Sequence, residues 1–276
     1  MTDELILTFD LGTTRLKVAL FDLAGRLVAQ VSRRNVDCHE AGAHWQSADR
    51  WWQDCIDCTQ QLVREQHIDT SAVKGISLSG RASAAIFVDA TGKVICDPWS
   101  DTRHNEVLKA LLRGRNRDDV AMYGATLLAK AQYLQIESPD VFEKVRHLLY
   151  AKDFLLFRLT GECVTDPSSG PDGQWDSELV RESNIPSAML PTPKMPWQLA
   201  GEVSATAARS LGLHAGTPVA VGAHDGICAN TGAGSAFPGQ YAITLGTHAV
   251  VRAITEVRPK GALRFYGYPP DRHVIG

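Results

Sequence analysis

The sequence predicts a mixed α/β fold, because strand-like and helix-like segments alternate along the chain. Short apolar runs with a two-residue alternation open the sequence, and residues 5–10 are the first of them. An amphipathic helix is expected over 47–67, where Trp51, Cys55, Cys58 and Leu62 recur at helical spacing. The 276 residues, 44% of them apolar and 21% charged, suffice for one large or two medium globular domains.

The first residues predict a three-stranded antiparallel meander. Strands are expected at 5–10, 16–21 and 27–31, joined by a tight turn at 11–14 and a second turn at 24–25. A dinucleotide-binding fold begins instead with a strand followed by a helix. The opening of the chain therefore excludes that fold.

The rest of the chain continues the alternation. Residues 102–160 are expected to be helical, and 166–173, rich in Pro, Gly, Ser and Asp, to form an ordered loop. The other predicted elements are strands at 75–78 and 84–88 with a turn at 90–92, a strand at 218–221, a turn at 222–226, a helix at 227–233 and a strand at 241–245.

Charge and cysteine content limit the class of protein. The 28 basic and 31 acidic residues give a net charge of −3, which offers no basic footprint for nucleic acid or an anionic membrane. The amino terminus is acidic and no apolar run approaches the ~20 residues that span a bilayer, so we expect a cytoplasmic protein. The Cys55-x-x-Cys58 pair is expected to pack in the core rather than bind metal. A homodimer is compatible with the sequence, which does not fix the oligomeric state.

A faint internal repeat links the two ends of the chain. Residues 11–20 align without gaps on 245–254 and share a Leu-Gly-Thr turn between two apolar segments. The repeat indicates either two related lobes or two unrelated hairpin turns that each need glycine at a positive φ.

The Gly12-Thr13-Thr14 turn has the composition of a phosphate-binding loop. Successive backbone N–H groups and two hydroxyls would face a ligand, with no Cβ at Gly12. Asp10 at the mouth of the turn suits such a loop only if Mg²⁺ lies between carboxylate and phosphate, and its alternative role is to cap the hairpin. Neither G-x-x-x-x-G-K-[ST], G-x-G-x-x-G nor H-E-x-x-H occurs in the chain, so a nucleotide site needs another architecture.

Asp225 lies among small residues just before a predicted helix. One interpretation is a helix N-cap, for which Asp is a preferred residue. The other is a general base, because an aspartate needs no large pKa shift to accept a proton while a hydroxyl attacks phosphorus.

Several blocks, taken together, resemble the FGGY family of carbohydrate kinases. They are Phe9-Asp10-Leu11-Gly12-Thr13-Thr14, Ala43-His44-Trp45-Gln46 through Trp51-Trp52, Trp99-Ser100-Asp101-Thr102-Arg103, Lys152-Asp153, Asp166 and Gly222-Ala223-His224-Asp225. The resemblance implies an actin-like, ribonuclease-H-like fold of two lobes, with ATP and a sugar in the cleft between them.

The resemblance also implies site roles. Asp10 would help hold Mg²⁺, and Asp225 would be the catalytic base. Phosphate contacts would come from Gly12, Thr13 and Thr14 and, in a second loop, from Gly246 and Thr247. The sugar would meet a wall made of Arg81, Ser83, Trp99, Asp101 and Arg103. Trp99 has the alternative of a core position, and Asp101 with Arg103 that of an ion pair.

The chain departs from the family in two respects. Xylulokinases have Gln-Met-His-Gly where this chain has Arg81-Ala82-Ser83-Ala84, and Asp-Asn where it has Asp225-Gly226, which argues against xylulose. Arg81 is suited to a carboxylate or phosphate on the substrate, and its alternative is a surface side chain.

Family members are also much longer. We expect an amino-terminal lobe at 1–238 and the beginning of a second lobe at 239–276, with most of that lobe missing. The sequence therefore predicts an ATP- and Mg²⁺-dependent kinase of a sugar, polyol or sugar acid, which need not be active as this chain alone. The alternative is a non-catalytic, actin-like sugar-binding or regulatory module.

Overall fold

The computed structural model describes residues 4–40, 43–116, 120–171, 174–245, 249–257, 265–268 and 272–275. In chain order its elements are β1 (Leu5–Leu11), β2 (Arg15–Asp22), β3 (Leu27–Arg34), β4 (Asp37–Glu40), β5 (Ala43–Gln46), α1 (Ala48–Glu65), β6 (Val73–Gly80), β7 (Ala85–Val88), β8 (Val94–Cys96), α2 (Asn105–Leu111), α3 (Met122–Glu137), α4 (Pro139–Phe142), β9 (His147–Tyr150), α5 (Ala151–Thr160), β10 (Val164–Thr165), α6 (Ser177–Ser183), β11 (Thr192–Pro193), β12 (Leu199–Glu202), α7 (Ala205–Leu211), β13 (Pro218–Ala220), β14 (Ala223–His224), α8 (Asp225–Gly232), β15 (Tyr241–Leu245), β16 (Ala249–Thr255), β17 (Phe265–Tyr268) and β18 (Arg272–Ile275). The predicted α/β class is confirmed.

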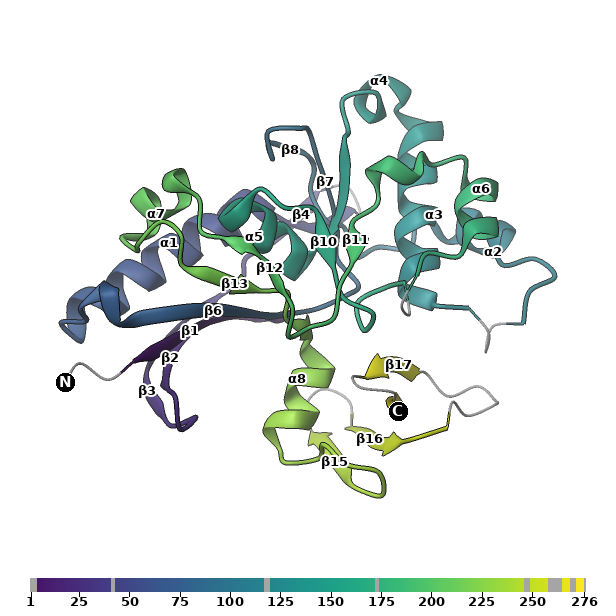
Figure 1. The fold of residues 1–276 in the computed structure, drawn as a ribbon. Coiled ribbons are helices and arrows are strands. Elements are labelled where there is room, and N and C mark those ends of the chain that lie inside the picture. The colour runs from purple at the N-terminus through teal and green to yellow at the C-terminus, as the bar shows by residue number, and fades with distance from the viewer. Residues whose placement is uncertain are drawn as a thin grey trace.

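A seven-stranded mixed sheet forms the centre of the molecule (Figure 1). Its order is β12-β13-β6-β1-β2-β3, and β14 also pairs with β6. The predicted meander is present, since β1, β2 and β3 pair antiparallel, whereas β6 runs parallel to β1. Alternate β1 side chains, Leu7 and Phe9 among them, are buried, and Thr8 and Asp10 occupy the other face. The sheet thus has one apolar face and one partly polar face.

Helices α1, α5 and α7 cover the apolar face of this sheet (Figure 1). The predicted helix at 47–67 is α1, which begins where the Ser47 side chain accepts a hydrogen bond from the Arg50 N–H. Cys55 and Cys58 are 1% and 0% exposed within the main core, as expected for packing residues. Burial raises the pKa of both thiols.

A second apolar core lies beside the first. It is built from the small sheet β8-β7-β9 and helices α2, α3 and α6. The prediction that 102–160 is helical throughout is wrong at β9, which pairs antiparallel with β7. The four residues of β9, His-Leu-Leu-Tyr, are too few to show a period, and pairing with β7, which is distant in sequence, makes them a strand.

The predicted elements near the end of the chain form with shifted bounds. The strand expected at 218–221 is β13, but the predicted turn at 222–226 contains β14 and the first turn of α8. Strands β15, β16, β18 and β17 make a separate four-stranded sheet. The hairpin β15–β16, like β1–β2, is antiparallel, so both copies of the sequence repeat are strand pairs.

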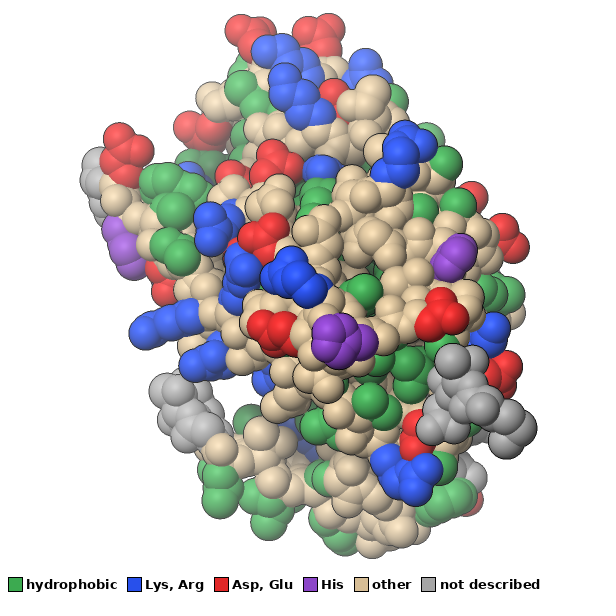
Figure 2. Space-filling model, turned by 90° about the vertical axis from the view of Figure 1, so that its left-hand side faces the viewer, with side chains coloured by type: hydrophobic (Ala, Val, Ile, Leu, Met, Phe, Trp, Pro, Cys, Tyr) green, Lys and Arg blue, Asp and Glu red, His purple; other side chains and the backbone are tan. Residues whose placement is uncertain are grey.

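Surface charges of both signs are mixed. On the face shown in Figure 2, Lys and Arg side chains lie among Asp and Glu side chains. Several make ion pairs, such as Arg33 with Asp54 and Asp57 at 3.2 and 2.7 Å. Within the described ranges, none of the helices has the length and apolar character needed to cross a bilayer.

We predict that Phe154→Ala lowers the free energy of unfolding by about 3–5 kcal/mol, because Phe154 is completely buried in the main core beneath the sheet. Urea unfolding followed by circular dichroism measures the change. Phe237→Ala is the matched control, since Phe237 is 59% exposed and its truncation is expected to cost less than about 0.5 kcal/mol. Equal effects of the two substitutions would contradict the assigned core.

Candidate active site

Three strand ends converge at one edge of the central sheet. Strands β1 and β6 are parallel and end in register, with Leu11 opposite Gly80. Strand β14 is parallel to β6 and places His224 opposite Gly80 as well. The next residue of each strand, Gly12, Arg81 or Asp225, therefore lies at the same edge, where open α/β sheets bind their ligands.

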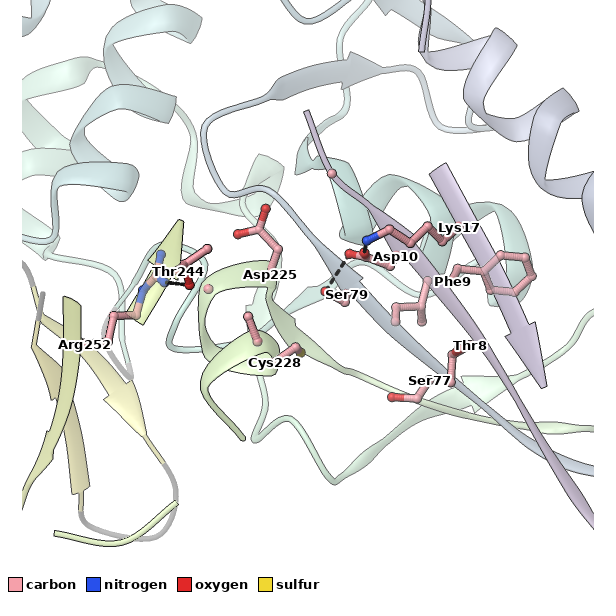
Figure 3. Close-up of a pocket in the computed structure, with 14 residues that line it drawn as sticks. Thr8, Phe9, Asp10, Lys17, Ser77, Ser79, Asp225, Cys228, Thr244 and Arg252 are labelled. Carbon is pink, nitrogen blue, oxygen red and sulfur yellow. Dashed lines mark hydrogen bonds and ion pairs between the residues drawn. The ribbon is translucent and has the colours of Figure 1, made fainter. Parts of the chain in front are cut away.

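A cavity of about 600 Å³ opens beside this edge (Figure 3). Polar residues from the partly polar face of β1, β2 and β6 form one side of it. The α8 start and the β15–β16 hairpin contribute the remainder. Its lining comprises Thr8, Phe9, Asp10, Gly12, Lys17, Ser77, Leu78, Ser79, Asp225, Gly226, Cys228, Ala229, Thr244 and Arg252.

The turn after β1 is fixed through its carbonyl groups. Asn35 Nδ2 donates to the Gly12 and Thr13 carbonyls at 2.9 and 3.1 Å, and Gln46 Nε2 donates to Thr13 at 3.2 Å. Thr13 and Thr14 are exposed, and their N–H groups have no intramolecular acceptor among the described residues. Gly12 does not have the positive φ that a hairpin turn was expected to need; a Cβ there would lie 3.4 Å from the Arg15 carbonyl. The turn thus presents backbone donors outward.

Asp10 faces the cavity between two donors. Its carboxylate accepts hydrogen bonds from Lys17 Nζ at 2.9 Å and Ser79 Oγ at 3.0 Å (Figure 3). These partners are side chains, so the structure does not support Asp10 as a cap of the hairpin. Sequence reasoning missed Lys17, although it pairs directly with Asp10 across the β1–β2 ladder and follows from the register once the turn length is known.

Asp225 is the first residue of α8, and His224 is its N-cap. The N-cap interpretation of Asp225 is therefore wrong, because the imidazole takes that place: His224 Nδ1 accepts from the Gly226 N–H at 3.1 Å. With Nδ1 as acceptor, the proton of a neutral ring lies on Nε2, 3.1 Å from Asp225 Oδ1. Burial lowers the pKa of His224, which favours this neutral form. The histidine thus orients the carboxylate.

A buried ionic cluster supports β14 from behind. Lys152 Nζ lies 2.5 Å from Asp153 and 2.9 Å from Asp166, and all three side chains are fully buried. Ser168 Oγ donates to Asp166 and accepts the His224 backbone N–H at 3.0 Å. Burial raises the pKa of Asp153, although the Lys152 charge opposes this shift. The same lysine also pairs with Asp166, so one cation serves two carboxylates. The cluster links the strand that precedes Asp225 to the body of the domain.

Arg252 reaches the same cavity from the β15–β16 hairpin. It donates to Thr244 Oγ1 at 3.2 Å, and in the view of Figure 3 it lies across the cavity from Lys17. Its guanidinium packs on Gly226, where an added Cβ would lie 2.8 Å from Nη2. No local sequence signal marks Arg252, because its place depends on packing between distant segments. The predicted phosphate-loop residues Gly246 and Thr247 lie outside the described residues.

The five residues predicted as a sugar wall do not line this cavity. Ser83 is exposed, and Asp101 and Arg103 form an ion pair, in which the guanidinium lowers the pKa of the Asp101 carboxyl. Trp99 is only 5% exposed and packs edge to face on Phe87, with ring centroids 5.9 Å apart. Trp99 therefore has the core position that was its alternative.

Arg81 stands closer to the cavity. It follows Gly80 at the convergent edge, and its Nη2 donates to Gln46 Oε1 at 2.8 Å. The same Gln46 holds the Thr13 carbonyl. Arg81 is therefore linked through one side chain to the Gly-Thr turn.

The fold is the actin-like ATPase fold of sugar kinases. Residues 5–232 match the model of the N-terminal domain of the FGGY family of carbohydrate kinases, and the chain belongs to that family. The resemblance stated from the sequence is thereby confirmed.

Individual relatives are distant but match along nearly the whole chain. The chain is 25% identical over 283 residues to the xylulose kinase of Bacillus subtilis, covering 95% of this chain and 56% of that protein. It is 26% identical over 262 residues to the autoinducer-2 kinase of Salmonella typhimurium, covering 88% and 49%. The crystal structure of xylulose kinase from Rhodospirillum rubrum superposes with a TM-score of 0.88 at 22% identity, covering 99% and 60%. The chain thus spans about half to three fifths of the length of these relatives.

We predict a pH-dependent stability that originates at His104, which packs on Trp99. Burial, aided by the Lys130 charge and opposed by Asp101, lowers the pKa of His104 from 6.5 to about 4. The unfolded state therefore takes up the proton first, and stability present above pH 6.5 is lost as the pH falls toward 4. The loss attributable to this residue is about 3 kcal/mol.

Urea unfolding of wild type and His104→Gln from pH 7.5 to pH 4 checks this prediction. The free energy of unfolding of the wild type should fall relative to that of His104→Gln as the pH is lowered over that range, because only the wild type loses the contribution of His104. Parallel pH profiles would contradict it.

Proposed function

We propose that this chain carries the catalytic half of a carbohydrate kinase, which transfers a phosphoryl group from ATP to a hydroxyl of a sugar, polyol or sugar acid. One observation carries the proposal: a single cavity is lined both by the Asp225 carboxylate and by Asp10, Gly12 and Lys17 beside the Gly-Thr turn. Membership of the FGGY family and the kinase names of the relatives support it.

Asp225 acts as general base in this proposal. As the acceptor hydroxyl oxygen forms its bond to the γ-phosphorus, its proton passes to Asp225, and the bond to the leaving ADP oxygen breaks. Phosphoryl transfer depends mainly on alignment and charge stabilisation, so a carboxylate held beside the acceptor hydroxyl suffices. The Nε2–H of His224 holds one carboxylate oxygen and leaves the other to the substrate.

The phosphate groups are bound by donors from both sides of the cavity. We assign the outward N–H groups of Thr13 and Thr14, with Gly12 allowing close approach, to the terminal phosphates. Lys17 and Arg252 place positive charge on opposite sides, where negative charge develops on the transferred group. We assign Gly246 and Thr247 to a second phosphate loop. This loop would belong to a second lobe that begins at 239–276, after an amino-terminal lobe at 1–238.

Asp10 fits the requirements of a Mg²⁺ site. Mg²⁺ keeps several waters and takes only one or two carboxylates together with substrate phosphates. The Asp10 carboxylate lines the cavity, where it could serve as one such ligand. Asp10 would hold the ion, which would supply charge neutralisation to the phosphates. We place this reaction in the cytoplasm, as expected from the sequence.

We predict that Asp225→Asn lowers the rate of MgATP-dependent acceptor phosphorylation by about 10³-fold or more, because the amide cannot accept the proton. Coupled ADP release across ketoses, polyols and sugar acids measures the rate, and thermal unfolding verifies the fold. Asp140→Asn, at an exposed carboxylate on α4, is the matched control.

Near-normal turnover by Asp225→Asn would contradict the assignment of the base. Stabilisation of the wild type by sugar, with no effect of MgATP and no ADP release, would instead favour the non-catalytic binding module.

A second prediction concerns Arg252. Gly226→Ala should push the guanidinium away, because the new Cβ would lie 2.8 Å from its Nη2, and should lower the phosphorylation rate by at least about tenfold with the fold retained. Arg252→Gln should lower it by about 10²-fold. Gly232→Ala is the control on the same helix, since a Cβ there meets nothing within 4 Å. Equal rates for all three variants would exclude a role for Arg252.

A further inference from the structure

Arg81 occupies the middle of the three convergent strand ends. It is the first residue after β6, and its backbone N–H donates to the Leu11 carbonyl at 3.2 Å, at the end of β1. Its neighbours at the edge are the Gly-Thr turn on one side and Asp225, beyond β14, on the other. Arg81 therefore stands beside the place where a substrate hydroxyl between Asp225 and the phosphate turn would lie.

The Arg81 guanidinium has only neutral partners. Nη2 donates to Gln46 Oε1, and the group lies over the Trp51 ring, 5.1 Å from its centroid. Nε is buried without an acceptor. Within the part of the chain that the structure describes, Arg81 has no carboxylate at ion-pair distance. Burial lowers its pKa to about 10, although the Asp37 and Asp225 carboxylates oppose this.

A second buried cation adds to the positive charge. Lys130 is 3% exposed and donates to the Trp99 and Ser83 carbonyls at 2.7 and 3.3 Å. Burial lowers the pKa of Lys130 to about 8, and the positive charge of Arg81 is the next largest cause of this shift. The two cations are therefore close enough to repel each other. The nearby Asp101 is already neutralised by Arg103. This side of the site therefore holds two cations, Arg81 and Lys130, neither of which has a carboxylate at ion-pair distance among the described residues.

Such an arrangement favours an anionic ligand. A half-buried cation without a counter-charge is costly, and an anion that binds beside it offsets the cost. The planar guanidinium also matches the two oxygens of a carboxylate or phosphate in a bidentate geometry. Stacking on Trp51 and the Gln46 bond fix its orientation before a ligand arrives, which lowers the entropy lost on binding.

We propose that the acceptor substrate carries an anionic group that binds Arg81, so that the preferred acceptors are acidic sugar derivatives rather than neutral sugars or polyols. The inference rests on the proposed kinase function and specifies its substrate class. A carboxylate, as in an aldonic acid, and a phosphate, as in a polyol phosphate, share this chemistry, and the experiment distinguishes them.

The test uses matched acceptors that differ only in the charged group. Five- and six-carbon aldonates are compared with the alditols of the same configuration and with the alditol phosphates. Isothermal titration calorimetry without nucleotide measures binding to this chain, and coupled ADP release with MgATP measures turnover. We expect at least one aldonate or alditol phosphate to bind at least about tenfold more tightly than its alditol, and the preference to weaken as salt rises.

Variants assign this preference to Arg81. Arg81→Gln should remove it while the weak binding of the alditol remains, and Arg81→Lys should retain part of it with a melting temperature close to wild type. Arg33→Gln is the matched control, because Arg33 pairs with Asp54 and Asp57 outside the site. A preference that survives Arg81→Gln, alditols bound as tightly as their acids, or no binding by any of the acceptors would each overturn the inference.

The two arms separate this inference from the proposed function. Turnover of alditols at the rate of their acids would retain the kinase and refute the anionic acceptor. Binding of acids that depends on Arg81, without ADP release by the complete enzyme that carries this chain, would retain the anion site and refute the kinase.

Discussion

The in-register ending of β1, β6 and β14 is the constraint on which the site depends. Leu11 and His224 both stand opposite Gly80, so the residues that follow the three strands emerge side by side. The approach of β14 requires Gly222, which has a φ of 74° and whose added Cβ would lie 1.9 Å from the Leu78 carbonyl oxygen. A side chain at this position would push β14 away from β6 and with it Asp225 away from the Gly-Thr turn. The spacing between Asp225 and the Gly-Thr turn is thus a property of backbone pairing.

Buried polar contacts keep this edge in place. Lys152, Asp153 and Asp166 bury three charges behind the sheet, and such a cluster is a poor source of net stability compared with apolar packing. The cluster instead positions β14, because Asp166 accepts a hydrogen bond from Ser168 and Ser168 accepts one from the backbone N–H of His224. On the other side, Gln46 joins Arg81 to the turn that follows β1. Hydrogen bonds therefore hold both the strand that precedes Asp225 and the Gly-Thr turn in place before any ligand binds.

Local patterns in the sequence predicted the elements whose structure is decided locally. The alternation in β1 and β2 and the spacing in α1 are visible because each buries one face along its length. Strand β9 was not predicted because its four residues show no period. Of the two interpretations of Asp225, the N-cap is wrong because the His224 imidazole takes that position. Asp10 and Asp225 were identified from residue type and resemblance, and the structure brings both to one cavity. Arg252 could not be found this way, since its position depends on a hairpin that packs against a helix from elsewhere in the chain.

The most direct test of the account is a crystal structure of this chain with Mg²⁺ and the β,γ-imido analogue of ATP. We expect the terminal phosphates to lie against the Thr13 and Thr14 N–H groups and Lys17, with Mg²⁺ beside Asp10 and the γ-phosphate facing Asp225 across the cavity. Electron density for the triphosphate at any other place, or on the side of the sheet away from Asp225, would contradict it.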